Sequence, residues 1–158
     1  MSEHKPKIVI GRLEHVWVVA TDQKKVPARI DTGARTTAVW ASDVREHNGQ
    51  LTWKFFGNGS EFYTGTEFAT THFEKRVVAS STGHKEVRYL IPITLQIKGR
   101  RVRTKCTLAN RQTQAFPILI GRNTLTGKFV VDVQHGSKQL SMSDTERFNE
   151  LQAELKGN

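Results

Sequence analysis

The sequence has a single cysteine, Cys106, so no disulfide can form within the chain. Small secreted domains commonly depend on several disulfides, and their absence is typical of a protein in the reducing cytoplasm. Residues 1–7 lack the apolar core of a signal peptide, and no apolar run approaches the roughly 20 residues that a membrane span needs. We therefore expect a cytoplasmic protein without a membrane segment.

Acidic residues are scarce relative to basic ones. Fifteen Asp and Glu residues stand against 24 Lys and Arg, which gives a formal net charge of +9 at pH 7. This excess predicts attraction to polyanions, which include nucleic acid, anionic membranes and acidic polypeptides. No stripe of aromatic residues interleaved with Arg or Lys is present to stack on bases, so we do not expect a nucleic-acid partner.

Helical periodicity is also rare in this chain of 158 residues, which is long enough for one domain with its own core. From residue 8 to residue 133, short runs rich in Val, Ile, Thr and Trp alternate with polar turns, a pattern typical of β-strands. Ser143 and Glu146 match a helix capping box, and apolar residues follow at helical spacing. We predict a flexible N-terminus over residues 1–7, a mainly β domain over residues 8–142, and a C-terminal helix and tail over residues 143–158.

One acidic turn, Asp31-Thr32-Gly33, suits catalysis. Residues 26–30 before it read as a short apolar strand, with Pro27 near the start where a missing N–H is tolerated, and Gly33 allows a sharp turn. A carboxylate placed there would be half sheltered and close to backbone N–H groups. The tripeptide alone is more typical of an ordinary turn, so its meaning depends on the rest of the chain.

Two later segments complete a recognisable pattern. Residues 75–89 have the form of a β-hairpin with Ser80, Ser81, Thr82 and Gly83 at its tip, and residues 116–125 read Phe-Pro-Ile-Leu-Ile-Gly-Arg-Asn-Thr-Leu. With Asp31-Thr32-Gly33-Ala34, these segments resemble the catalytic turn, flap and second signature of the retropepsins, the single-domain aspartic proteases of retroviral type. The resemblance implies a retropepsin-like acid-protease barrel.

A bacterial family within that group is similar over shorter motifs. Residues 30–38, 78–83 and 108–111 resemble retropepsin-like proteins that are associated with ATP-grasp glutamate ligases and labelled ATP-dependent zinc proteases. This resemblance implies an ATP-grasp ligase as an associated protein. The label names a zinc-dependent mechanism, whereas the Asp-Thr-Gly motif is typical of hydrolysis by carboxylates.

Peptide hydrolysis by carboxylates needs two of them, which share one proton. The chain has one Asp-Thr-Gly, so the second carboxylate must be Asp31 of another subunit, which a two-fold homodimer would supply. The resemblance implies that Thr32 bonds across the two-fold axis, that Gly33 contacts the substrate backbone, and that the tip at residues 80–83 closes over the peptide.

Arg35 departs from the retroviral motif, which has an acidic residue here that pairs with the arginine corresponding to Arg122. Two arginines would approach the same place in this chain, so they either spread apart or bind an anion between them. We expect Ala34, Arg35 and Arg122 to contact substrate. The positive charge and the ligase association together favour an acidic, glutamate-rich polypeptide.

The sequence thus predicts an aspartic-type endopeptidase, a hydrolase active as a homodimer on a peptide or protein substrate. Two alternatives stay open: a non-catalytic binding module of the same fold for an acidic partner, and a zinc-dependent protease as the family label suggests. The six histidines form no His-Glu-x-x-His motif, and neither a Cys pair nor a phosphate-binding loop is present. We therefore predict no metal site and no cofactor of its own, so any ATP dependence would come from a partner.

Overall fold

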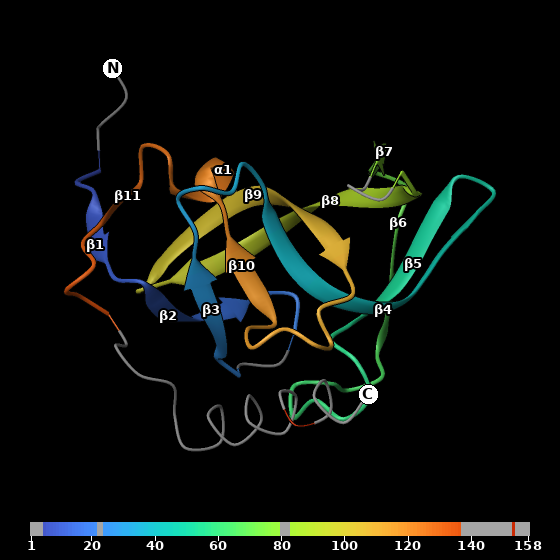
Figure 1. Ribbon diagram of the computed structural model, residues 1–158, viewed down its shortest axis with the longest axis horizontal. Coiled ribbons are helices and arrows are strands. Elements are labelled where there is room, and N and C mark those ends of the chain that lie inside the picture. The colour runs from blue at the N-terminus through green and yellow to red at the C-terminus, as the bar shows by residue number, and fades with distance from the viewer. Residues whose placement is uncertain (1–4, 22–23, 80–82, 137–152, 154–158) are drawn as a thin grey trace.

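The computed structural model describes residues 5–21, 24–79, 83–136 and 153 (Figure 1). The predicted C-terminal helix, the predicted hairpin tip at Ser80, Ser81 and Thr82, and most of the N-terminus lie outside these residues. The elements in chain order are β1 (Ile8–Ile10), β2 (Leu13–Val18), β3 (Val26–Ile30), β4 (Thr37–His47), β5 (Gln50–Phe55), β6 (Glu67–Thr70), β7 (Glu74–Ala79), β8 (Lys85–Ile97), β9 (Arg100–Ala109), β10 (Ile118–Ile120), α1 (Arg122–Leu125) and β11 (Phe129–Val131).

Six strands close into a barrel in the order β10, β3, β2, β8, β9, β4, because β10 pairs with β4 as well as with β3. The mainly β fold predicted from the sequence is therefore confirmed. A separate parallel pair, β1 with β11, lies at one edge of the molecule (Figure 1).

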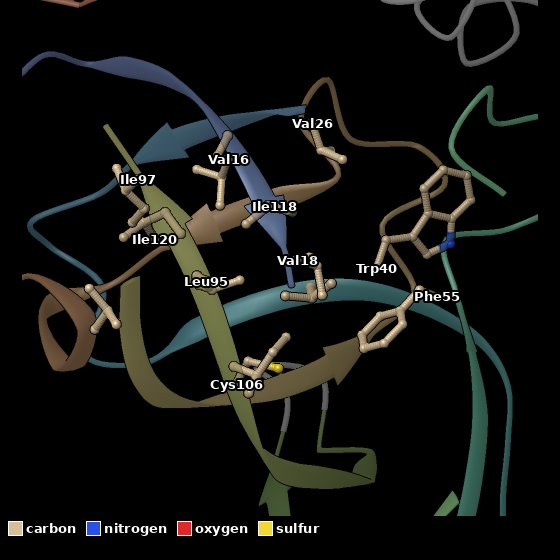
Figure 2. Packing of buried hydrophobic residues seen from close by; sticks show 14 of the residues in the cluster. Val16, Val18, Val26, Trp40, Phe55, Leu95, Ile97, Cys106, Ile118 and Ile120 are labelled. Atoms are coloured by element: carbon tan, nitrogen blue, oxygen red, sulfur yellow. The ribbon is translucent and has the colours of Figure 1, made fainter. Parts of the chain in front are cut away.

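The barrel encloses an apolar core built by strand alternation. Every second residue of the second half of β8 is buried, from Ile91 through Leu95 to Ile97, because successive side chains point to opposite faces. These side chains meet Ile118 and Ile120 from β10 in the barrel interior (Figure 2). Cys106 lies in the same cluster with no exposed surface, and burial raises the pKa of its thiol far above the usual range.

The long strand β4 leaves the barrel and continues into a hairpin with β5. The register shifts between Ser42 and Arg45, and Asp43 has a positive φ of 49°, so a bulge bends the strand where it changes sheets. The turn at Asn48-Gly49 closes the hairpin with both residues at positive φ, as an Asn-Gly hairpin turn requires.

The short strand β10 determines where the candidate site lies. It runs parallel to β3, with Ile118 opposite Ala28, and antiparallel to β4, with Ile118 opposite Val39. The connection from β3 to β4, which contains the Asp-Thr-Gly turn, therefore passes over the end of β10 and the start of α1 (Figure 1).

Candidate active site

Asp31 follows the last residue of β3 directly, and its backbone N–H donates to the carbonyl oxygen of Ile120 at 2.9 Å. Its carboxylate is half-buried and accepts a hydrogen bond at Oδ1 from the Gly33 N–H at 3.0 Å. A Cβ on residue 33 would come within 3.2 Å of that same oxygen, so glycine keeps the turn tight. The backbone thus fixes the direction of the Asp31 carboxylate.

Four successive carbonyl groups of the turn, from residue 32 to residue 35, accept hydrogen bonds from the start of α1. The Arg122 Nη1 donates to the oxygens of Thr32 at 3.2 Å and Gly33 at 2.9 Å. The backbone N–H groups of Arg122 and Asn123 donate to the oxygens of Ala34 at 2.8 Å and Arg35 at 3.2 Å. This set of bonds, which we call the turn clamp, holds the chain after Asp31 against α1.

A buried polar network lies beneath the turn clamp. The Thr37 hydroxyl is 2.6 Å from the Thr124 hydroxyl and accepts a hydrogen bond from the Gly121 N–H at 3.0 Å. The Asn123 Oδ1 accepts from both the N–H and the hydroxyl of Thr37, at 2.9 and 3.0 Å. Thr37 and Thr124 have no exposed surface, so the network fixes α1 to the first residue of β4 from inside the barrel.

Gly121 allows the two segments to approach this closely. A Cβ at residue 121 would lie 2.6 Å from the carbonyl carbon of Thr36, a distance that no real side chain tolerates. The glycine of the second signature is therefore required by backbone packing.

A pocket of about 530 Å³ opens beside the turn. The strands β7 and β8, which match the predicted flap hairpin, line one side of it, and the chain after Asp31 lines another. Its lining residues are Ala34, Arg35, Thr36, Ala38, Arg76, Glu86, Arg88, Leu90, Thr107, Leu108, Ala109, Asn110, Arg111 and Gln114. Four arginines against one glutamate make this pocket strongly positive.

The structure separates the predicted substrate-binding residues into groups. Ala34 and Arg35 line the pocket, whereas Arg122 belongs to the turn clamp behind it. Gly83 is described, with a positive φ of 83°, next to the undescribed tip residues. Arg35 and Arg122 thus differ in their surroundings, since Arg35 lines the pocket and Arg122 bonds to the turn.

Sequence reasoning missed three arginines of the pocket, Arg76, Arg88 and Arg111. Arg111 is partly buried, and its Nε donates to the carbonyl oxygen of Phe116 at 2.9 Å. Burial, together with the positive charge of Arg29, lowers the pKa of Arg111. The available signal was the pairing of residues 76 and 88 across the predicted hairpin, which places both side chains on one face.

Within the residues that the structure describes, no group of three or more His, Cys, Asp and Glu side chains is arranged to hold a metal ion. The same residues include no helix of the length and apolar character that a bilayer span requires.

Comparisons with known proteins agree with this geometry. A family model described as "Retropepsin-like aspartic endopeptidase RimB" matches residues 9–140. Proteins named "Probable alpha-L-glutamate ligase" from Shewanella pealeana and Desulfotalea psychrophila are 30% and 24% identical to this chain, each matching 84% of it. The chain spans only 29% of the length of these relatives.

A solved structure of a Legionella pneumophila protein of unknown function has the same fold. It superposes with a TM-score of 0.58 and 18% identity, covering 85% of this chain and 100% of that one. The closed barrel and the family match over residues 9–140 confirm the predicted retropepsin-like barrel. On the family match over most of its length, the chain belongs to the RimB-like family of retropepsin-like aspartic endopeptidases.

Proposed function

We propose that this chain is an aspartic-type endopeptidase that acts as a homodimer on acidic polypeptides. The observation that carries the proposal is the half-buried carboxylate of Asp31, which accepts a hydrogen bond from the Gly33 N–H and whose turn continues into the lining of a positive pocket. The family match supports hydrolysis as the reaction class.

The mechanism needs the Asp31 carboxylates of two subunits within proton-sharing distance. The ionised carboxylate takes a proton from water as the water oxygen attacks the peptide carbonyl carbon. The protonated carboxylate of the partner subunit donates its proton to the carbonyl oxygen. The carboxyl group that took the water proton then gives it to the amide nitrogen, and the C–N bond breaks. As the carbonyl reforms, a hydroxyl of the tetrahedral intermediate returns a proton to the partner's carboxylate, which restores the shared proton.

The symmetry follows from the single Asp-Thr-Gly turn of this chain. Thr32, next to Asp31, is exposed, and a two-fold axis between the two carboxylates would bring its two copies close together. The turn clamp makes this exposed turn rigid before any partner arrives.

The substrate assignment has two supports. The pocket beside the turn carries four arginines and one glutamate, which favours carboxylate side chains over neutral ones. The relatives named as glutamate ligases point to a polypeptide extended with glutamate and to a ligase as an associated protein.

The test is cleavage of a glutamate-rich peptide, followed by mass spectrometry, for wild type, Asp31→Asn and the matched control Asp132→Asn. We expect Asp31→Asn to lose cleavage while keeping the wild-type circular dichroism spectrum, and Asp132→Asn to cleave normally. Cleavage by Asp31→Asn at the wild-type rate would show that the assignment is wrong.

Subunit mixing tests the shared site directly. With free exchange, an equimolar mixture of wild type and Asp31→Asn should retain about half the activity of its wild-type content alone, because mixed dimers hold one carboxylate. Mixing with Asp132→Asn should cause no such loss. A chain that sedimentation equilibrium shows to be monomeric at high concentration would instead favour the binding module.

A further inference from the structure

The flap-like hairpin carries two arginines at directly opposed positions. Arg76 of β7 pairs with Arg88 of β8 in the antiparallel register. Like charges that face each other across such a pair destabilise it, whereas opposite charges stabilise it. The hairpin therefore has a built-in repulsion at its midpoint.

Both arginines line the pocket beside the Asp31 turn, and their protein carboxylate partners hold them loosely. The Arg88 Nη2 lies 3.7 Å from the Oε2 of Glu86, and the Arg76 Nη2 lies 3.7 Å from the Oε2 of Glu74. Close guanidinium–carboxylate bonds are about 2.7–2.9 Å long. Because each guanidinium has five donors, both keep bonding capacity for a ligand in the pocket.

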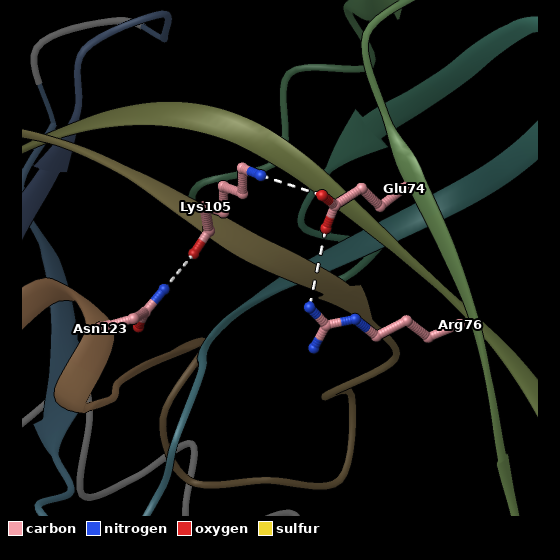
Figure 3. Close-up of polar contacts among 4 residues, drawn as sticks. All are labelled: Glu74, Arg76, Lys105 and Asn123. Carbon is pink, nitrogen blue, oxygen red and sulfur yellow. Dashed lines mark hydrogen bonds and ion pairs between the residues drawn. The ribbon is translucent and has the colours of Figure 1, made fainter.

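Lys105 competes for the carboxylate that Arg76 approaches. Figure 3 shows Glu74 between the two cations, with its Oε1 3.0 Å from the Lys105 Nζ. The carbonyl oxygen of Lys105 accepts from the Asn123 Nδ2 at 2.7 Å, so β9 is bonded to α1 at the residue that also binds Glu74. Glu74 thus bonds closely to Lys105 and neutralises the charge of Arg76 only in part.

Arg35 and Arg111 add to the positive charge of the pocket from the side of the barrel. Arg111 is fixed by its bond to the carbonyl oxygen of Phe116, and burial, with a further contribution from the charge of Arg29, lowers its pKa. A carboxylate bound among these groups would reduce the repulsion between the cations of the hairpin and those of the barrel.

We propose that Arg76 and Arg88, with Arg35 and Arg111, form a subsite for the carboxylate side chain of an acidic residue in the peptide. Binding of that carboxylate relieves the Arg76–Arg88 repulsion, so an acidic side chain strengthens the pairing of β7 with β8 and a neutral one does not. This inference rests on the proposed function for its effect on cleavage, but its binding step is measurable without cleavage.

The binding test uses the full chain carrying Asp31→Asn, which keeps the peptide intact, with fluorescent oligoglutamate as the probe. We expect Arg88→Gln and Arg76→Gln each to weaken binding by about three- to tenfold. The matched control is Arg103→Gln on the exposed face of β9, which removes the same charge outside this pocket. Equal losses for Arg88→Gln and Arg103→Gln would overturn the subsite and leave only a net-charge effect.

Peptide variants identify the ligand chemistry. Replacing single glutamates of the probe by glutamine should weaken binding to the parent chain, and one position should lose this effect in the Arg88→Gln background. A phosphoserine peptide that binds more tightly than the glutamate peptide would assign the pocket to phosphate and overturn the carboxylate assignment.

Hydrogen exchange of the β7 and β8 amides tests the effect on the hairpin. In the free protein, Arg88→Gln should increase protection because the repulsion is gone, whereas Arg88→Lys should not. Oligoglutamate should increase protection in the Asp31→Asn parent and less in the Arg88→Gln background. Unchanged protection in the free variant would overturn the repulsion, even if the variant binds weakly.

The two proposals fail in different ways. If Asp31→Asn cleaves peptides normally while the arginine variants lose binding, catalysis by Asp31 is wrong and the subsite stands. If Asp31→Asn is inactive while the arginine variants bind normally, the subsite is wrong and catalysis by Asp31 stands.

Discussion

The Arg122 Nη1 lies 2.9 Å from the carbonyl oxygen of Gly33, so Arg122 holds the Asp31 turn through its backbone. In the retroviral motif the corresponding arginine pairs with an acidic residue at the position of Arg35. Here the carbonyl oxygens of Thr32 and Gly33 accept hydrogen bonds from the Arg122 guanidinium, and Arg35 lines the pocket.

Replacing Arg122 should loosen the turn. Arg122→Met removes the donor to the Thr32 and Gly33 oxygens, and we expect the free energy of unfolding in urea to fall by about 1 kcal/mol. Peptide cleavage should fall more steeply than stability, because the carboxylate direction depends on this turn. For Arg122→Lys we expect losses of stability and cleavage smaller than those of Arg122→Met, since lysine keeps the charge without the planar fork. The exposed Arg45→Met serves as the control, and an equal loss there would contradict the turn clamp.

Removing the Thr37 hydroxyl should be costly because its partners are buried. Thr37→Val keeps the shape but leaves the Gly121 N–H and the Thr124 hydroxyl without this partner, which should cost about 1–3 kcal/mol in urea unfolding. Thr37→Ser keeps the hydroxyl and should retain the network. The prediction fails if the serine variant is the less stable of the two.

The ion pairs Glu74–Lys105 and Glu46–Lys75 should stabilise the fold less in acid. A hydrogen bond from Lys105 lowers the pKa of Glu74, and one from Lys75 lowers the pKa of Glu46. Because both folded-state pKa values are depressed, these contacts stabilise the fold above the unfolded glutamate pKa of 4.5, and the contribution is lost as pH falls through the lower folded values.

Carboxyl carbon shifts in an NMR titration measure this directly. Lys105→Met should raise the pKa of Glu74 towards 4.5 and leave that of Glu46 unchanged, since the latter is bonded to Lys75. A Glu74 pKa that does not move in the variant would show that Lys105 has no such role.

Binding of an acidic peptide should weaken with added salt. Salt screens charges over about 8 Å at physiological ionic strength, and the chain carries a net charge of +9. Fluorescence anisotropy of oligoglutamate on Asp31→Asn should show affinity falling steeply between low and physiological salt. A glutamine peptide of equal length is the control, and salt-insensitive binding of oligoglutamate would count against the substrate assignment.

The sequence predicted those parts of the fold that local patterns determine. Short runs rich in Val, Ile, Thr and Trp predicted strands between residues 8 and 133, and the apolar residues of β8 that fill the barrel lie in one of these runs. The position of Asp31 at the end of a strand was visible because an apolar run precedes the glycine turn.

Other parts of the site depend on contacts between distant segments. Thr37 reads as an ordinary strand residue until the barrel places it against Asn123 and Thr124. Arg111 and Arg35 line the same pocket although they are far apart in the sequence, and no local pattern predicts that they meet.

The insertion of β10 between β3 and β4 has a consequence for biosynthesis. The residues that clamp the Asp31 turn lie up to 90 positions later in the chain, so a growing polypeptide has no assembled turn until residue 122 has left the ribosome. Such distant contacts also fold slowly compared with local ones. A nascent chain therefore carries no clamped Asp31 turn beside other newly made proteins, and the candidate site can mature only after nearly the whole barrel has been synthesised.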